Sequence, residues 1–407
     1  MSSLSLQTPA GAPEAEEPGA PASGPAGASV PAGADRAFAA PAASAVIALP
    51  PLAVPGPVPA ARPARLGAID LFKGLAILEV LTHHVSANAL SRLDPGSLAF
   101  FLVALGNRAL HFAVPAFLFM TALVFMRSAM RPTWSVRDFY WSRVVKSLVP
   151  YLLWSGFYML LRVRTTSLSL ADLDLNQVWF WVLNGKASYH LYFLVVALQF
   201  YALFPLLVPL FRRRPSFPVV AAGALAVQLA LYWANRLAWH AVFPGSLVIW
   251  YVIPIALGLH VGSVFETFGT WWNRNAKFVA LAAVAGFSGY LPLAYQALLG
   301  LPVNTFAHEA FTWLFTSSCA ILLFGFASFL ARRNGPVIAG LRVLGQNSLQ
   351  VYLLHPAVIT LAAFLNFLPD RASLASHGPL LLAALAVPLS AALLVKGSAL
   401  SRLLFGR

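Results

Sequence analysis

The stretch IDLFKGLAILEVLTHHV, residues 69–85, has the apolar content of a membrane-spanning helix, yet several of its side chains are ionisable. Four of them lie close together: Lys73, Glu79, His83 and His84. Each such group costs a few kcal/mol at the centre of a bilayer. A lone lysine can extend to the interface, and a lone histidine is more often a packing residue. Four of them in one span therefore indicate a functional helix.

The composition of the whole chain agrees with a membrane location. Of its 407 residues, 59% are hydrophobic and only 10% are charged, and the mean hydropathy is +0.75. A water-soluble domain of this length does not have so apolar a composition. The single cysteine, Cys319, allows neither a disulfide framework nor a thiolate metal site, and we expect it to be a small core residue. No bound metal or cofactor is predicted.

Apolar runs of about 20 residues, enough to cross about 30 Å of hydrocarbon, alternate with short polar connections from Ile69 onward. Because open sheet edges are not tolerated in lipid, we predict an all-α integral membrane bundle. The predicted bundle has about ten transmembrane helices, at residues 69–89, 108–126, 144–162, 190–211, 217–235, 246–265, 278–298, 311–331, 343–366 and 379–396. The apolar piece 98–105 is too short to span, so we predict a surface or re-entrant segment there.

Both ends of the chain differ in composition from the apolar part between them. Residues 1–60 consist mostly of Ala, Pro, Gly and Ser, which cannot bury enough surface to offset their ordering entropy. We therefore predict a disordered cytoplasmic tail there. A secretory signal is not predicted, because a basic first segment is missing and prolines interrupt the apolar stretch. Residues 398–407 are predicted to be a short basic cytoplasmic tail.

The net charge of +14 follows from the distribution of basic residues. Arginines and lysines gather in the connections on one side of the predicted bundle, for example at 212–214 and 332–333. By the positive-inside rule, this side faces the cytoplasm, as do both termini. A basic cytoplasmic rim beside anionic lipid accounts for the charge, so no nucleic-acid partner is expected.

The ionisable residues of the first helix occupy defined faces. Lys73 and His84 are eleven residues apart, which places them on one face about 16 Å from each other. Glu79 and His83 are four residues apart, and we expect the carboxylate to hold the imidazole in one tautomer. His83 and His84 point about 100° apart, so at most one of them shares the face of Lys73.

The segment 69–85 resembles the first-helix signature of the membrane acyltransferase 3 family. In that signature a basic residue, ten intervening residues and a histidine follow an Asp-containing start. Lys73 and His84 occupy those two positions, and lysine stands where arginine is commoner. The resemblance extends over residues 66–397 and implies one membrane domain. Members of the family transfer an acyl group, usually acetyl, from acyl-coenzyme A inside the cell to a hydroxyl of a sugar or other surface molecule.

Two further segments in the first half of the domain carry the same resemblance. HFAVPAFLFMTALVF, residues 111–125, looks like the second helix of the family, although Thr-Ala stands at 121–122 where most members have Ser-Gly. FYWSRVVKSLVPYLLW, residues 139–154, resembles a basic motif at the cytoplasmic mouth of the third helix. Its two basic residues, Arg143 and Lys146, are three positions apart and precede a proline, as in the family.

Two later segments also match. SYHLYFLVVAL, residues 188–198, resembles a His-Leu-Trp-Phe-Leu stretch at the start of the fourth helix, with Tyr192 in place of tryptophan. LGQNSLQVYLLHP, residues 344–356, is similar to a late-helix pattern that ends in Tyr-Leu-Leu-His-Pro and contains Tyr352 and His355. Five segments in the right order on a ten-helix frame make the resemblance fairly specific.

We expect the catalytic residues to lie in the first helix. His84 is the candidate general base, because a neutral imidazole accepts a hydroxyl proton near neutral pH and can return it to a leaving thiolate. His83 remains an alternative base. If His84 is the base, Glu79 and His83 form a supporting pair.

The donor and the acceptor need different groups. Arg143 and Lys146 suit the phosphates of acyl-CoA as co-substrate, with Lys73 continuing the positive path inward, although ordinary positive-inside anchors have the same composition. We expect acceptor or cavity positions at His355, Tyr352 and His190. His308 and Glu309 are predicted to lie on a solvated outer loop.

The sequence thus predicts a multi-pass O-acyltransferase of the bacterial inner membrane. Its predicted partners are the lipid bilayer, acyl-CoA (with acetyl-CoA as the first choice) and a glycan or lipid-linked saccharide acceptor. The alternative is a transporter or flippase for a surface polysaccharide or lipid-linked sugar, since intramembrane charges also mark translocation paths. Against it, the charges concentrate in one helix, and no pair of Gly- or Pro-broken helices is apparent. A sensor or scaffold would have no cavity.

Overall fold

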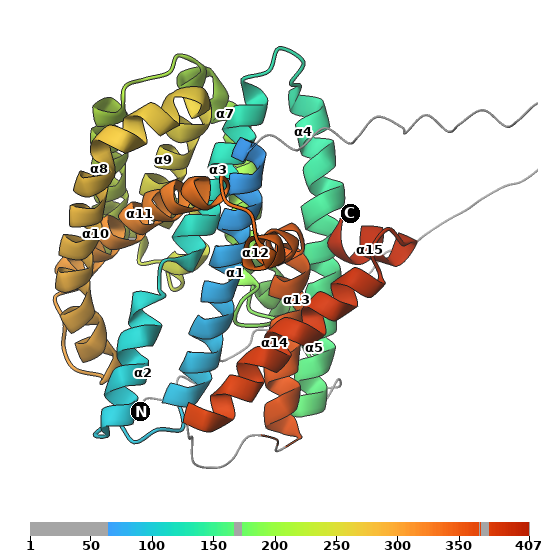
Figure 1. Ribbon diagram of the computed structural model, residues 1–407. Helices are drawn as coiled ribbons and strands as arrows, with labels where there is room; N and C mark the ends of the chain where they lie inside the picture. Colours follow the sequence, from blue (N-terminus) through green and yellow to red (C-terminus); the bar gives the residue numbers. More distant parts are fainter. Residues whose placement is uncertain (1–63, 167–172, 366, 368–373, 407) are drawn as a thin grey trace, which may run out of the picture. The chain divides into compact units, whose positions relative to one another are not determined.

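The computed structural model describes residues 64–166, 173–365, 367 and 374–406 (Figure 1). Throughout these ranges the secondary structure is helical and no strand occurs. The all-α prediction is therefore confirmed. The predicted disordered tail, residues 1–60, lies outside the described residues. The predicted basic tail at 398–407 contains the helix α15 (Ala399–Phe405), and Trp154 Nε1 donates a hydrogen bond to Leu404 O at 2.9 Å.

The first helix, α1 (Ala64–Leu90), runs through the middle of the described helices in Figure 1. It packs against α2, α3, α11, α12, α13 and α14. The first half of α1 contributes Leu71 and Phe72 to an apolar core with α3, α9, α10 and α11. Its second half contributes Ile77 and Leu81 to another core with α5, α7, α13 and α14. The ionisable helix is therefore enclosed by protein rather than surrounded by lipid.

Two glycines set the position of α1 against α12 (Pro336–Gln346). A Cβ atom on Gly74 would overlap Leu341 O, and a Cβ atom on Gly345 would overlap Asp70 O. The two backbones therefore touch, which is the close approach that small residues permit between membrane helices. Gln346 Nε2 also donates to Asp70 Oδ2 at 3.1 Å across this seam.

The second span differs from the prediction. The helices α2 (Leu98–Ala109) and α3 (Ala113–Ala129) together form one candidate span, Leu98–Ala129, that is interrupted at residues 110–112. The apolar piece 98–105, predicted to be a surface or re-entrant segment, is the first part of this span. The piece alone is too short to cross a membrane, and the span reaches full length only with α3, beyond the break.

The remaining helices follow in chain order. They are α4 (Val136–Arg143), the π-helical turn η1 (Val144–Leu148), α5 (Val149–Thr165), α6 (Leu175–Asn184), α7 (Tyr192–Arg212), α8 (Phe217–Ala234), α9 (Val252–Ser263), α10 (Phe268–Leu298), α11 (Thr305–Leu330), α13 (Ser348–Phe364) and α14 (Leu374–Leu394). Between α8 and α9 lie a second π-helical turn, η3 (Asn235–Trp239), and short 3₁₀ turns. The helices α12 and α13 meet at Asn347 with a bend of 80°.

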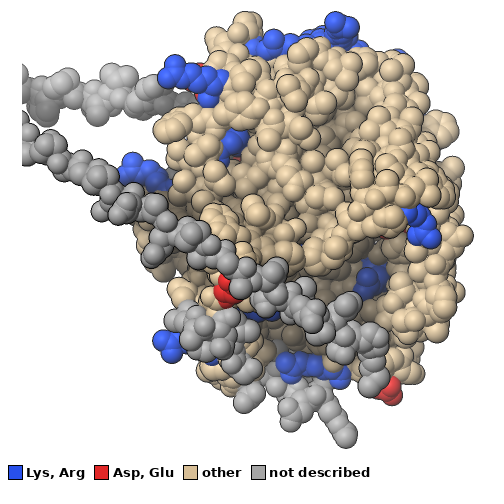
Figure 2. Space-filling view, turned by 180° about the vertical axis from the view of Figure 1, so that it is seen from behind, with Lys and Arg blue, Asp and Glu red and all other residues tan. Residues whose placement is uncertain are grey.

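Among the described residues, seven helices are long and apolar enough to cross a membrane, or eight if α12 and α13 form one span. The predicted number of about ten is therefore not reached by this criterion. The ionisable side chains of α1 lower its hydropathy, and α9 has only 12 residues. Figure 2 shows a face on which uncharged residues cover most of the surface, with several basic side chains along its upper edge. The cytoplasmic placement of the termini stays a prediction.

Candidate active site

Three of the predicted site histidines come together from separate parts of the chain. The rings of His84 in α1 and His355 in α13 lie 5.3 Å apart between centroids and are nearly parallel, with an interplanar angle of 25°. His190, in the turn before α7, lies 5.9 Å from His355. We call His84, His190 and His355 the histidine cluster. His190 and His355 are 1% and 0% exposed, so the cluster is largely withdrawn from solvent.

Hydrogen bonds orient two of these rings and leave nitrogen atoms unused. His355 Nδ1 lies 3.1 Å from Val351 O, and since a carbonyl only accepts, Nδ1 carries the proton. His190 Nδ1 lies 3.1 Å from Ser188 Oγ. The Nε2 atoms of His190 and His355 are buried and have no hydrogen-bond partner among the described residues. Buried polar atoms are usually satisfied, so these atoms mark a place for a ligand or water.

Tyrosines surround the histidine cluster. The hydroxyl of Tyr352 donates to His190 O, so this predicted acceptor residue positions the backbone that carries a histidine. The ring of Tyr158 lies 4.8 Å from that of His190. The ring of Tyr189 lies 4.8 Å from that of His84, and its side chain is 49% exposed, so it connects the cluster with the outside of the fold. Sequence analysis did not single out Tyr158 or Tyr189, although Tyr189 lies in the quoted SYHLYF stretch.

His83 belongs to a different environment from His84. Its Nδ1 lies 3.1 Å from Asn107 O, and Asn107 Nδ2 donates to His83 O at 2.9 Å and to Ser86 Oγ at 2.8 Å. These contacts tie His83 to the end of α2. His84, on another face of α1, is the residue that reaches His355. The structure thus places His84 in the cluster and His83 beside it, with ring centroids 5.5 Å apart.

The expected pair between Glu79 and His83 does not form in the described structure. Glu79 is 6% exposed, and neither carboxylate oxygen has a hydrogen-bond partner among the described residues. The carboxylate lies near the backbone N–H groups of Phe112 and Ala113, at the start of α3. The break in the second span is the reason, because it places a positive helix N-terminus beside Glu79 and the Asn107 carbonyl beside His83.

The cationic residues predicted to hold the donor lie outside the histidine cluster. Lys73 Nζ forms an ion pair with Asp70 Oδ1 at 3.2 Å, and Asp70 is held in turn by Gln346. The Arg143 guanidinium lies over the ring of Phe125, 5.0 Å from its centroid, and Arg143 Nη2 donates to Ser142 Oγ at 2.8 Å.

Lys146 has a different position from Arg143. It lies in the π-helical turn η1, and its side chain is exposed. The backbone of Gly406 packs against that of Lys146, which brings α15 against η1. The turn η1 also packs against α4, α5 and α7.

A second row of rings leads away from the cluster. The ring of His111, at the break between α2 and α3, lies 5.8 Å from His83 and 6.0 Å from Tyr290 of α10. Tyr290 lies 5.6 Å from His308, whose Nδ1 is 3.9 Å from Glu309 Oε1. We call His83, His111, Tyr290 and His308 the outer row. Sequence analysis did not predict it, because its members are far apart in the chain and only the fold aligns them.

His308 and Glu309 were predicted to lie on a solvated outer loop, but the structure places them in a helix. They are the fourth and fifth residues of α11, with side chains 24% and 25% exposed. As for metals, the described part of the chain contains no group of three or more His, Cys, Asp or Glu side chains arranged to hold an ion.

A family model described as an acyltransferase domain, that of the acyltransferase 3 family, matches residues 66–395. The match includes α3 to α13 and the three histidines of the cluster. Comparisons with curated proteins and with solved structures find no match to this chain.

Proposed function

The chain belongs to the membrane acyltransferase 3 family and is an acyltransferase, and from that premise we propose a specific reaction for it. In this proposal it moves an acyl group, acetyl as the first candidate, from cytoplasmic acyl-CoA to a hydroxyl of a cell-surface saccharide. The protein would act in the bacterial inner membrane. The observation that supports this most is the buried histidine cluster, in which the Nε2 atoms of His190 and His355 have no hydrogen-bond partner among the described residues.

The proposed chemistry needs one group to carry a proton. The acceptor oxygen attacks the thioester carbonyl while a ring nitrogen of His84 takes the hydroxyl proton. The carbon–sulfur bond then breaks, and His84 returns the proton to the thiolate, which yields an ester and free CoA. His355 and His190, whose rings lie 5.9 Å apart, would bind the reacting groups beside His84. Tyr189 offers a neutral O–H donor to the developing oxyanion.

The donor would enter from the basic side. Lys73 is on the same helix as His84 and about 16 Å before it, which suits a long thioester arm that ends at the cluster. Arg143 and Lys146 would hold the phosphates, as oppositely charged partners of a polyanion. Asp70 should weaken the binding of phosphate at Lys73, because phosphate oxygens must compete with the Asp70 carboxylate, whose Oδ1 lies 3.2 Å from Lys73 Nζ.

Substrate translocation is the second candidate, and two features favour it. The second span is interrupted at residues 110–112, and α12 and α13 are bent by 80° at Asn347. The sequence argument against a transporter was that no pair of Gly- or Pro-broken helices is apparent, whereas the structure has one interruption just before Pro115 and one bend at Asn347. Discontinuous helices often surround substrate sites in transporters.

Consumption of thioester distinguishes the two candidates. Purified protein in vesicles would be given radiolabelled acetyl-CoA, and wild type would be compared with His84→Ala and with His260→Ala. His260 is a matched control, because it is a histidine of α9 with 7% exposure that lies outside both groups of rings. We expect His84→Ala to lose about 10²- to 10⁴-fold in turnover while CoA still binds, and His260→Ala to keep its rate. If the wild type consumes neither acetyl-CoA nor longer acyl-CoAs, the acyl-transfer proposal is wrong.

A further inference from the structure

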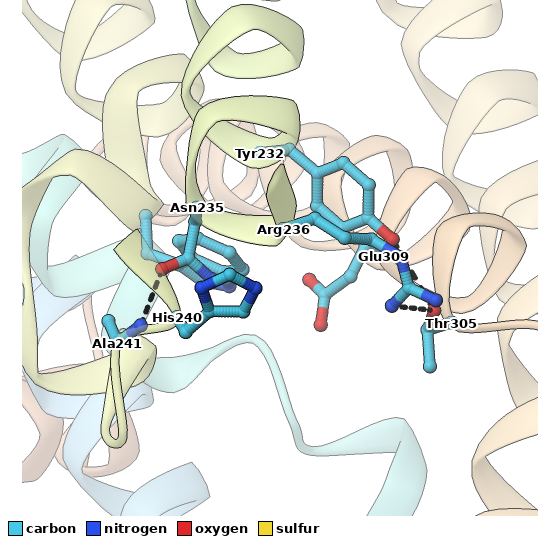
Figure 3. A pocket seen from close by; sticks show the side chains of 8 residues that line it. Tyr232, Asn235, Arg236, His240, Ala241, Thr305 and Glu309 are labelled. Carbon is cyan, nitrogen blue, oxygen red and sulfur yellow. Dashed lines mark hydrogen bonds between the residues drawn. The ribbon is translucent and has the colours of Figure 1, made fainter. Parts of the chain in front are cut away.

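A pocket of about 520 Å³ lies between the end of α8 and the start of α11, away from the histidine cluster (Figure 3). Its lining includes two aromatic rings and several polar side chains: Tyr232, Trp250, Asn235, Arg236, His240 and Glu309. No role follows for these residues from the acyl-transfer step. We call this volume the outer pocket, because the predicted topology places it on the side opposite the cytoplasm.

The backbone around the outer pocket is held in an unusual conformation. The helix α8 widens into the π-helical turn η3 and ends at His240, a non-glycine residue with φ of 48°. Asn235 fixes this arrangement, since its carbonyl accepts from His240 N at 2.8 Å and its Oδ1 accepts from Ala241 N at 2.9 Å. π-helical turns and left-handed non-glycine residues are costly and concentrate at functional sites.

The polar groups of the pocket suit an uncharged ligand with several hydroxyls. Arg236 Nη1 donates to Thr305 Oγ1 at 3.1 Å, and the Glu309 carboxylate extends into the open space in Figure 3. One cation and one carboxylate share the volume, so a phosphate or carboxylate ligand would meet repulsion as well as attraction. Hydroxyl groups can instead donate to Glu309 and accept from Arg236.

The aromatic residues supply the apolar part of such a site. The rings of Tyr232 and Trp250 have centroids 6.2 Å apart and form one wall of the pocket. The C–H face of a sugar ring is apolar, whereas its edge carries the hydroxyls. An aromatic wall beside a few placed polar groups is the usual composition of a small-molecule pocket.

The outer pocket is connected to the catalytic region through the outer row. Glu309, which lines the pocket, is 3.9 Å from His308, the last ring of that row. From there, contacts between rings lead through Tyr290 and His111 to His83, the neighbour of His84. The pocket is too far along this row to hold the reacting hydroxyl.

We propose that the outer pocket binds a neutral sugar unit of the acceptor that lies beyond the unit to be acylated. This rests on the proposed function, because it assumes a saccharide acceptor. The pocket then selects the acceptor, and the histidine cluster performs the transfer.

The test is direct binding of methyl glycosides to the full-length protein in nanodiscs, measured by saturation-transfer NMR. The panel would contain the methyl glycosides of glucose, galactose, mannose and rhamnose. Wild type is compared with Trp250→Ala and Glu309→Gln, and with Trp239→Ala as the matched control. Trp239 belongs to η3 but is 54% exposed and is not part of the pocket lining. Thermal unfolding of each variant shows whether it is folded.

We expect at least one glycoside to bind the wild type, and each pocket variant to weaken its Kd about tenfold or more. The control should stay within twofold. Glu309→Gln preserves shape, so its effect does not depend on a folding defect. If no glycoside binds the wild type, or if both pocket variants bind as well as the wild type, the proposal is overturned.

Hydrolysis of acetyl-CoA without glycoside separates this proposal from the proposed function. Both pocket variants should hydrolyse acetyl-CoA at the wild-type rate, because they leave the histidine cluster intact. Loss of hydrolysis in both would assign the pocket to the donor reaction and overturn an acceptor role. If the wild type consumes neither acetyl-CoA nor longer acyl-CoAs, even with the glycosides present, the acyl-transfer function itself is refuted, while the glycoside titration still decides whether the pocket binds sugar.

Discussion

The ionisable residues near the two ends of α1 differ in whether the polar groups around them have hydrogen-bond or ion-pair partners. At one end Lys73 is paired with Asp70, Asp70 is held by Gln346, and the backbone is in contact with α12. At the other end His84 is surrounded by rings, and its neighbours His190 and His355 keep unpartnered Nε2 atoms among the described residues. A satisfied charge stabilises a position, whereas unsatisfied nitrogen atoms are available for chemistry. The comparison assigns anchoring to one end and reaction to the other.

The largest effect on kcat should come from replacing His84, and the same replacement of the adjacent His83 provides the comparison. We expect His84→Asn to lower kcat about 10²- to 10⁴-fold, since the proton acceptor is lost. His83→Asn should lower it less than about tenfold, because His83 is tied to Asn107. Single-turnover transfer from radiolabelled acetyl-CoA measures both. The reverse order of effects would make His83 the base and contradict the comparison.

A single methyl group added at the contact between α1 and α12 should lower the free energy of unfolding. Gly345→Ala places a Cβ against Asp70 O, so we expect a loss of about 1–3 kcal/mol in the free energy of unfolding. Gly340→Ala in the same helix is the control, because its Cβ meets nothing within 4 Å. That change should be neutral or stabilising by up to about 1 kcal/mol. Thermal unfolding in detergent compares the two, and equal effects would rule out the tight contact.

A smaller effect is expected where a tyrosine supports the histidine cluster. Tyr352→Phe removes the hydroxyl that donates to His190 O, and the lost hydrogen bond should cost about 1 kcal/mol. Because the bond positions His190, kcat should fall about fivefold while the KM for acetyl-CoA stays constant. Tyr140→Phe, which also removes a hydroxyl bonded to a carbonyl but lies in α4, should leave kcat unchanged. A drop in both variants would point to a general effect on the fold.

The smallest effect should appear at the paired end of α1. Asp70→Asn removes the carboxylate beside Lys73, so acyl-CoA should bind about two- to fourfold more tightly, as expected for a partly exposed charge. Equilibrium binding of CoA at low salt measures this change. The control is Asp138→Asn in α4, whose carboxylate accepts from Ser135. Unchanged or weaker binding in Asp70→Asn would remove Lys73 from the donor path.

The sequence predicted the parts of this arrangement that depend on one helix. The spacing of Lys73 and His84 and the different directions of His83 and His84 follow from helical period alone. His190 and His355 were expected to be acceptor or cavity positions, and their rings lie 5.9 Å apart in the structure.

The parts that sequence analysis missed depend on where helices break. The helix stops at residues 110–112, just before Pro115. A proline has no N–H to bond the carbonyl four residues earlier, here that of His111, and the sequence analysis did not use this signal. This break directs Glu79 toward α3 and His83 toward Asn107, so the predicted pair is replaced by two tertiary contacts. His111 and His308 are 197 residues apart in the sequence, and only the packing of α10 and α11 aligns them.

The bend at Asn347 has a consequence for how this domain tolerates insertions. His355 lies eight residues after the bend, and the contact of Gly345 with Asp70 fixes the chain just before it. One residue inserted between Asn347 and Val351 would turn His355 by about 100° and move it about 1.5 Å along the axis of α13. The same insertion at residues 332–335, ahead of α12, would be absorbed by the connection. Length variation among homologous sequences should therefore be rare within this eight-residue interval and common before α12.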